Sequence, residues 1–148
     1  MFVDFVLASL HHLLLIGLVA ILTFELAVVR EGLAASAIRR VARADSLYGL
    51  LALSLLIVGF SRVYFGIKGP DFYFVSHVFW TKIAVFVLVG LLSVPPTLRI
   101  LGWSRAARHD PAYIAPPGEI TAARRFMHIE AGVLLLIPIL AAAMARGY

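Results

Sequence analysis

Four long apolar runs, separated by short polar segments, account for most of this 148-residue sequence. The runs cover about residues 5–29, 46–65, 72–94 and 126–145. Crossing the ~30 Å hydrocarbon core of a bilayer takes roughly 20 apolar residues in an α-helix, so each run is long enough to span a membrane. The pattern predicts an all-α membrane protein, an antiparallel four-transmembrane-helix bundle that forms a single domain over residues 1–148.

The polar segments predict how the helices are joined. Residues 30–43 are amphipathic and arginine-rich, which favours a separate helix at the membrane interface. A short glycine- and proline-containing turn precedes the third helix, which is expected to begin at about Phe72 and to stop at Pro95-Pro96. An irregular loop over 109–118 leads to a fourth helix, in which we expect a kink at Pro138.

Composition supports a membrane protein and narrows its chemistry. The chain is 62% hydrophobic and 14% charged, with a mean hydropathy of +0.98, which leaves little sequence for a soluble domain. It contains no cysteine, so disulfides, cysteine-ligated iron–sulfur clusters, covalent haem attachment and thiol catalysis are excluded. A redox cofactor would therefore have to bind non-covalently.

The distribution of positive charge predicts an orientation. The net charge is +5, but membrane proteins acquire basic loops for topological reasons, so we expect no nucleic-acid partner. Nine of the thirteen lysines and arginines fall on the side opposite the termini: Arg30, Arg39, Arg40, Arg43, Arg99, Arg105, Arg108, Arg124 and Arg125. The positive-inside rule makes that side cytoplasmic and both termini external. We expect a multi-pass protein of the bacterial inner (plasma) membrane.

Two adjacent histidines lie inside the first apolar run. Asp4, His11, Leu18 and Glu25 follow at steps of seven, and seven residues turn an α-helix by roughly 700°, so these four side chains lie close to one face. His12 is rotated by about 100° and points toward a neighbouring helix or lipid. The sequence leaves open which of the two histidines faces a site.

Matched depths suggest a shared cofactor. His11 lies about 9 Å below the start of the first helix and His77 about 8 Å below the start of the third. Two imidazoles on different helices can ligate one haem iron from opposite faces, and Arg62 near that level can pair with a propionate. We predict haem b, with His11 or His12 and His77 as ligands to the iron. A single histidine ligand and purely structural hydrogen bonding are the alternatives.

Lys82 lies about ten residues into the third helix, near the membrane midplane. A lysine there costs about 3 kcal/mol on insertion scales and normally has a partner, cavity or cofactor. We predict a charge or proton partner at the site, or an ion pair with Glu25 or Glu130. Trp80 is a candidate cofactor contact or a member of the interfacial aromatic belt.

Carboxylates gather toward the arginine-rich side. Glu25, Asp45 and Glu130 are expected to pair with arginines there, with a proton path as the functional alternative. His128 is expected about 17 Å in height from His11, so the two cannot bind one iron.

The length, the four spans, the early intramembrane histidine and the Trp80-Thr81-Lys82 stretch resemble the HemJ-type protoporphyrinogen oxidases. The chain is more similar still to an uncharacterised bacterial family of four-helix membrane proteins related to them. The resemblance implies haem b, a functional histidine at His11 or His12, and catalytic roles for Lys82 and Glu130. The third helix departs from the approximate Trp-x-His-x-Lys pattern of that family, because Thr81 precedes the lysine and His77 lies five residues before it.

The expected function is a b-type haem-binding oxidoreductase or electron-transfer protein, acting in porphyrin or haem metabolism. Its expected partners are the lipid bilayer, a porphyrin or quinone substrate, an electron partner that the sequence does not identify, and a second copy of the chain. The alternatives are a cofactor-free proton or small-solute transporter that uses Glu25, Lys82 and Glu130, and a structural subunit of a membrane complex.

Overall fold

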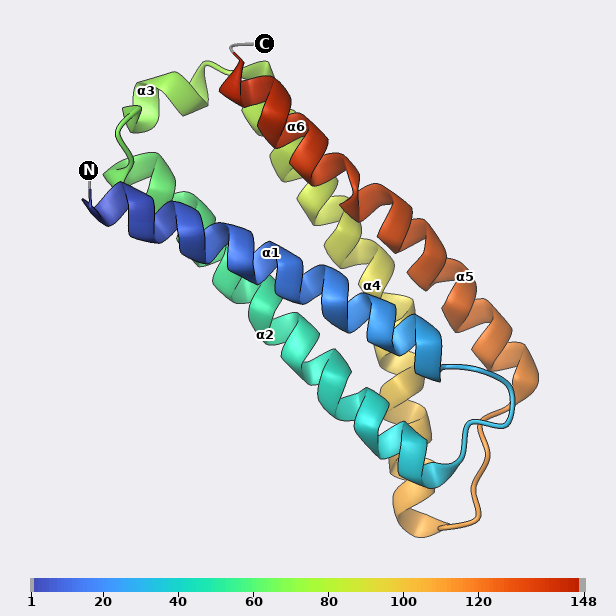
Figure 1. Ribbon diagram of the computed structural model, residues 1–148. Coiled ribbons are helices and arrows are strands. Elements are labelled where there is room, and N and C mark those ends of the chain that lie inside the picture. Colours follow the sequence, from blue (N-terminus) through green and yellow to red (C-terminus); the bar gives the residue numbers. More distant parts are fainter. Residues whose placement is uncertain (1, 147–148) are drawn as a thin grey trace.

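The computed structural model describes residues 2–146 and is almost entirely helical (Figure 1). Its helices in chain order are α1 (Phe2–Val28), α2 (Ala35–Phe65), α3 (Gly69–Phe74), α4 (His77–His109), α5 (Pro117–Leu134) and α6 (Leu136–Ala145). Four stretches are long and apolar enough to cross a membrane, namely α1, α2, α4, and α5 together with α6. The predicted four-span helical architecture is confirmed.

The outer surface of the bundle is apolar, as contact with lipid requires. Leu13, Ile16, Leu91 and Ile139 are each more than 60% exposed, although they lie within the spans. In water such a surface would be unfavourable, whereas lipid tails are as apolar as these side chains. The membrane-spanning helices therefore face the bilayer directly.

The bundle consists of two helix pairs that diverge toward one end. Helix α1 packs along α2, and α4 packs along α5 and α6. The two pairs contact each other where α2 packs on α4 and where α1 packs on α5. The backbone of α1 does not come close to that of α4 or α6. Figure 1 shows the pairs separating toward the end that holds both chain ends, where the short helix α3 connects them.

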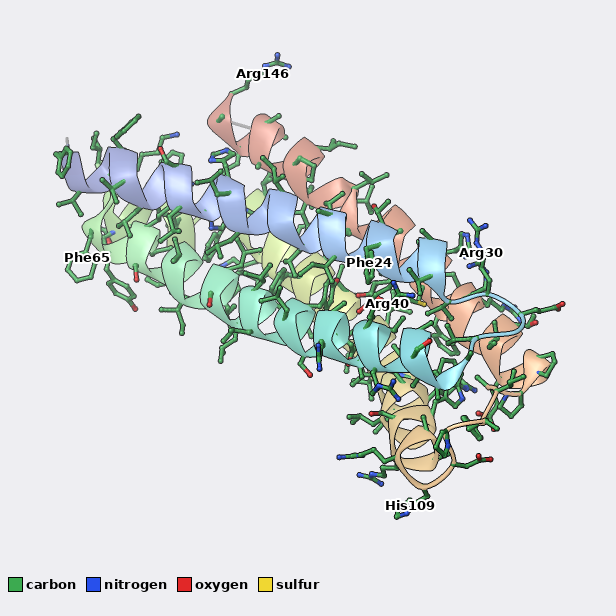
Figure 2. All side chains as sticks on the ribbon, turned by 60° about the horizontal axis from the view of Figure 1, so that its bottom comes forward. Phe24, Arg30, Arg40, Phe65, His109 and Arg146 are labelled. Atoms are coloured by element: carbon green, nitrogen blue, oxygen red, sulfur yellow. The ribbon has the colours of Figure 1, made fainter. Side chains whose placement is uncertain are left out.

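We call the end near residues 2, 66–68 and 146 the terminal end, and the end with the 29–34 and 110–116 connections the loop end. Figure 2 shows Phe65 and Arg146 at the terminal end, with Arg30 and His109 at the loop end. The two loop-end connections contact each other, since the Ala115 N–H donates to the Leu33 carbonyl at 3.0 Å.

The prediction of a separate interfacial helix over residues 30–43 is wrong, because residues 35–43 are the start of α2. Helix α2 runs without a break from Ala35 to Phe65. Ala35, Ile38 and Val41 are buried in the same core as the rest of the bundle. These three residues are spaced three apart and continue the apolar stripe of the helix. The arginines of this segment therefore lie on the other face, away from the core.

The prediction that the third span ends at Pro95-Pro96 is also wrong, because α4 continues through both prolines to His109. Each proline removes one backbone hydrogen bond, but its fixed φ is compatible with a helix. Packing of α4 against α2 and α5 holds the helix together beyond them, and Pro96 itself is buried. Membrane helices tolerate such prolines where neighbouring helices stabilise them.

The third span begins later than expected, at His77. Gly69, at φ 73°, turns the chain into α3, which ends at Phe74. Ser76 then caps α4, because its hydroxyl oxygen accepts a hydrogen bond from the Phe79 N–H at 3.3 Å.

The fourth span breaks at Leu135, between α5 and α6. Pro138 has no N–H to donate, and its ring crowds the carbonyl of Leu134 four residues earlier. The expected kink therefore occurs one turn before the proline that causes it.

Candidate functional site

A cavity of about 480 Å³ lies in the terminal half of the bundle, between the α1–α2 pair and the α4–α6 pair. Most of its wall is apolar, and Leu55, Phe79, Phe86 and Ile137 contribute to it. Its charged and imidazole side chains are His11, His12, Arg62, Lys68 and Lys82. None of the described residues that line it is a carboxylate. We call this space the cationic cavity.

His11 is placed in the cavity by a glycine on the facing helix. A Cβ atom at Gly59 would lie 3.4 Å from Cε1 and 3.7 Å from Nδ1 of His11, so the bare glycine backbone lets the imidazole pack closely on α2. The Nδ1 atom of His11 is buried and has no hydrogen-bond partner. By contrast, Nδ1 of the more exposed His12 donates to the Ala8 carbonyl at 2.6 Å.

Two cations approach His11 from different helices. The charges of Lys82 on α4 and Arg62 on α2 both act on its ring. The Nε atom of Arg62 is buried and has no hydrogen-bond partner. A half-buried concentration of positive charge with unpaired donors is suited to an anionic group of a bound molecule.

His77 and Trp80 do not line the cavity. His77 is the first residue of α4 and is exposed, whereas Lys82 lies five residues, about 7.5 Å, deeper along the same helix. The charged residue of α4 that shares the cavity with His11 is therefore Lys82. The Trp80 indole N–H donates to the Phe74 carbonyl at 3.0 Å and its ring stacks on Phe74, which ties α4 to α3.

A second polar group lies in the loop half of the bundle. Glu25 and Glu130 are 3% and 1% exposed, and the Tyr48 hydroxyl donates to Oε1 of Glu130 at 2.6 Å. The Thr97 hydroxyl donates to Oδ1 of Asp45 at 2.7 Å. The charges of Asp45 and Glu130 both act on Glu25, so the three carboxylates are neighbours. We call Glu25, Asp45 and Glu130 the carboxylate cluster.

The prediction that Asp45 and Glu130 pair with arginines is wrong. Both carboxylates accept hydrogen bonds from hydroxyl groups instead. Arg124 instead donates from Nη1 to the carbonyls of Leu26 and Val29, both at 2.6 Å. These are carbonyls at the C-terminal end of α1, where no intrahelical donor is available and a cation is favoured.

The cationic cavity and the carboxylate cluster are far apart. Fourteen residues separate His11 from Glu25 on α1, and fifteen separate Lys82 from Thr97 on α4. At 1.5 Å per residue each separation is about 21–23 Å along the helix. Leu18 and Val89, which lie midway, are fully or almost fully buried in the apolar core. Lys82 and Glu130, the two expected catalytic residues, therefore lie in different halves of the bundle.

Sequence reasoning missed Tyr48, Thr97 and Gly59. A signal for Tyr48 was present, because Tyr48, Leu55 and Arg62 follow at steps of seven on α2, as His11, Leu18 and Glu25 do on α1. Gly59 lies one turn before Arg62 on the same face. Thr97 had no comparable signal, because it follows two prolines that were expected to end the helix.

Residues 3–148 match the model of a protein family described as "Predicted membrane protein (DUF2214)". No curated protein and no solved structure matches the chain. Within residues 2–146, no three histidine, aspartate or glutamate side chains are arranged to hold a metal ion. That finding says little about haem, whose iron needs only one or two protein ligands.

Proposed function

This chain belongs to the DUF2214 family of predicted membrane proteins, and from that premise we propose that it is a membrane oxidoreductase or electron-transfer protein that binds haem b in the cationic cavity. The single observation that carries the proposal is the convergence of an unpartnered imidazole, at His11, with two cations in an otherwise apolar space.

The side chains present fit a haem. A cavity of about 480 Å³ lies within the range of roughly 300–1,000 Å³ that is typical of ligand sites, and its aliphatic and aromatic walls suit an apolar macrocycle. The imidazole of His11 would ligate the iron, and Arg62 and Lys82 would pair with the propionates. Bound haem would supply one-electron redox chemistry. The protein would fix its orientation, exclude water, and balance the propionate charge.

One protein ligand is better supported than two. His11 lines the cavity, whereas His77 does not, so a second imidazole from α4 has no support from the contacts. A haem with a single histidine ligand keeps one position open, and an open position suits contact with a substrate. We therefore favour an oxidoreductase, with a porphyrin or a quinone as the substrate class, over a protein that only transfers electrons.

The site would face the outside of the cell. The arginine-rich loop end is the cytoplasmic end by the positive-inside rule, so the cationic cavity would lie in the outer half of a bacterial inner membrane. An apolar ligand or substrate could then approach from the outer leaflet.

A cofactor-free transporter has less support. It would need a continuous polar path through Lys82 and Glu130, yet the two groups are separated along the bundle by buried leucine and valine side chains. Such a layer opposes the passage of ions because it offers no polar contacts.

The test is a reduced-minus-oxidised optical spectrum of detergent-purified protein expressed with ample haem. We expect a b-type spectrum that is lost in His11→Ala and retained in His77→Ala. His128→Ala is the matched control, because His128 is an exposed histidine whose ring bonds to its own helix at the Arg124 carbonyl. Folded wild-type protein without a Soret band would refute the proposal, and loss in His77→Ala as well as His11→Ala would restore the paired-ligand arrangement.

A further inference from the structure

We propose that Glu25, Asp45 and Glu130 form a proton-binding site in the loop half of the membrane, and that this site exchanges protons with water at the loop end. The proposal does not depend on haem, because the carboxylate cluster lies outside the cationic cavity.

The first observation is an unpartnered, buried carboxyl oxygen. Glu25 is 3% exposed, and its Oε1 atom has no hydrogen-bond partner. An ionised carboxylate in an apolar interior is very costly unless it is paired and hydrogen-bonded, so such groups take up a proton instead. The charges of Asp45 and Glu130 act on this carboxyl group.

The second observation is that the neighbours repel rather than compensate a negative charge on Glu25. On α2 they are Asp45 and the Tyr48 phenol, and on α5 the neighbour is Glu130. From α4 the cluster receives the uncharged Thr97, which bonds to Asp45. Carboxylates that share one site cannot all be ionised at modest cost, because like charges in a low dielectric repel strongly. At least one proton is therefore held among the three.

Arg124, the cation at the end of α1, binds backbone carbonyls rather than the carboxylates. Both 2.6 Å hydrogen bonds from Nη1 of Arg124 go to carbonyls of α1, one of them at Leu26, the residue after Glu25. Arg124 thus closes the end of α1 and leaves the carboxylates to their hydroxyl donors.

Access from water is provided at the loop end. Glu25 lies three residues before the end of α1, which is about 4.5 Å along the axis. A polar cleft of about 330 Å³, lined by Arg30, Glu31, Thr121, Arg124 and Ile120, opens beside that helix end. In the proposal, protons exchange with the cluster through this cleft, whereas the apolar layer at Leu18 and Val89 separates the cluster from the other half of the bundle.

A proton suits the cluster better than a metal ion. Within the described residues no three acidic or histidine side chains have an arrangement that could hold a metal ion. Two of the carboxylates accept hydrogen bonds from hydroxyl groups, and the Tyr48 hydroxyl can also pass a proton to or from Glu130.

The experiment is an infrared pH titration of the purified full chain in detergent, which follows the C=O stretch of protonated carboxyl groups. We expect this band in wild-type protein at neutral pH, and we expect its loss or strong reduction in Glu25→Gln. Asp71→Asn is the control, because Asp71 is an exposed carboxylate at the terminal end, outside both the cluster and the cleft, and should leave the band unchanged.

A second variant keeps the test decisive if Glu25→Gln does not fold. Asp45→Asn removes a neighbouring negative charge but retains a side chain of the same shape. Deprotonation of Glu25 should then become easier, so the band should disappear at a lower pH than in wild type. Folded wild-type protein with no carboxylic band at neutral pH would overturn the proposal, as would an unchanged titration in Asp45→Asn.

Discussion

Tyr48→Phe isolates one buried hydrogen bond of the carboxylate cluster. The substitution removes the hydroxyl that donates to Oε1 of Glu130 at 2.6 Å and keeps the aromatic ring. Tyr48 is 5% exposed and Glu130 is 1% exposed, so water cannot easily replace the lost donor. The variant therefore leaves a buried oxygen without a partner while it changes the packing very little.

The expected loss of stability follows from these two burials. A buried polar group left unpaired costs about 1–3 kcal/mol. Hydrogen bonds between membrane helices average about 0.6 kcal/mol and reach about 1.7, since the unfolded chain in a micelle also finds partners. We expect the upper part of the membrane range, about 1–1.7 kcal/mol, because the bond is short and connects α2 to α5.

The assay is reversible unfolding in mixed detergent micelles, followed by tryptophan fluorescence. Trp103 is a suitable reporter, since it is 2% exposed and its indole N–H donates to Glu119 at 2.6 Å. Tyr64→Phe is the matched control, because Tyr64 is 58% exposed and should change stability by less than about 0.5 kcal/mol. If Tyr48→Phe and Tyr64→Phe unfolded alike, the hydrogen bond would contribute nothing and the described geometry of the cluster would be wrong.

Three further predictions test other parts of the bundle. Arg124→Met removes the charged donor that closes α1 and should cost about 1.5–3 kcal/mol in the same unfolding assay; an unchanged midpoint would contradict the cap. Gly66→Ala should destabilise the fold by about 1–3 kcal/mol, since its Cβ would overlap the carbonyl oxygen of Arg62. Gly49→Ala has open space around its Cβ and should stabilise the fold by about 0.5–1 kcal/mol. Equal effects of the two substitutions would refute the clash. Lys82→Gln should weaken haem binding by about 10–150-fold in a haem titration, because it removes one charge-assisted contact worth about 1.5–3 kcal/mol. Unaltered affinity would remove Lys82 from the site.

Hydropathy alone predicted four spans because lipid imposes length and composition on each helix separately. The stripe at Asp4, His11, Leu18 and Glu25 likewise needed only the helical period, and its members Leu18 and Glu25 are indeed buried. These features depend on one helix and its solvent. They can be derived without knowing which helices are neighbours.

Features that depend on neighbouring helices were less predictable. The local rule that proline ends a helix failed at Pro95 and Pro96, where packing of α4 against two other helices overrides it. Depth counted from an expected helix start also failed, because α4 begins five residues later than Phe72. That shift removes His77 from the level of the cavity and leaves Lys82 there.

The separation of opposite charges in this bundle has a physical consequence for both proposed sites. With an effective dielectric constant of about 20, which describes buried protein sites as well as surface ones, unit charges 4 Å apart interact by about 4 kcal/mol, whereas charges 21 Å apart interact by about 0.8 kcal/mol. If Lys82 contacted Glu25, each would neutralise the other, and neither would bind a ligand of opposite charge. Their distance leaves the cations available to an anionic ligand and the carboxylates available to protons.

Two nearly independent sites should result. We therefore expect Glu25→Gln to leave the haem spectrum unchanged and His11→Ala to leave the carboxylic infrared band unchanged. Loss of both signals in either variant, with the fold intact by circular dichroism, would mean that the apolar layer around Leu18 and Val89 does not insulate the two halves.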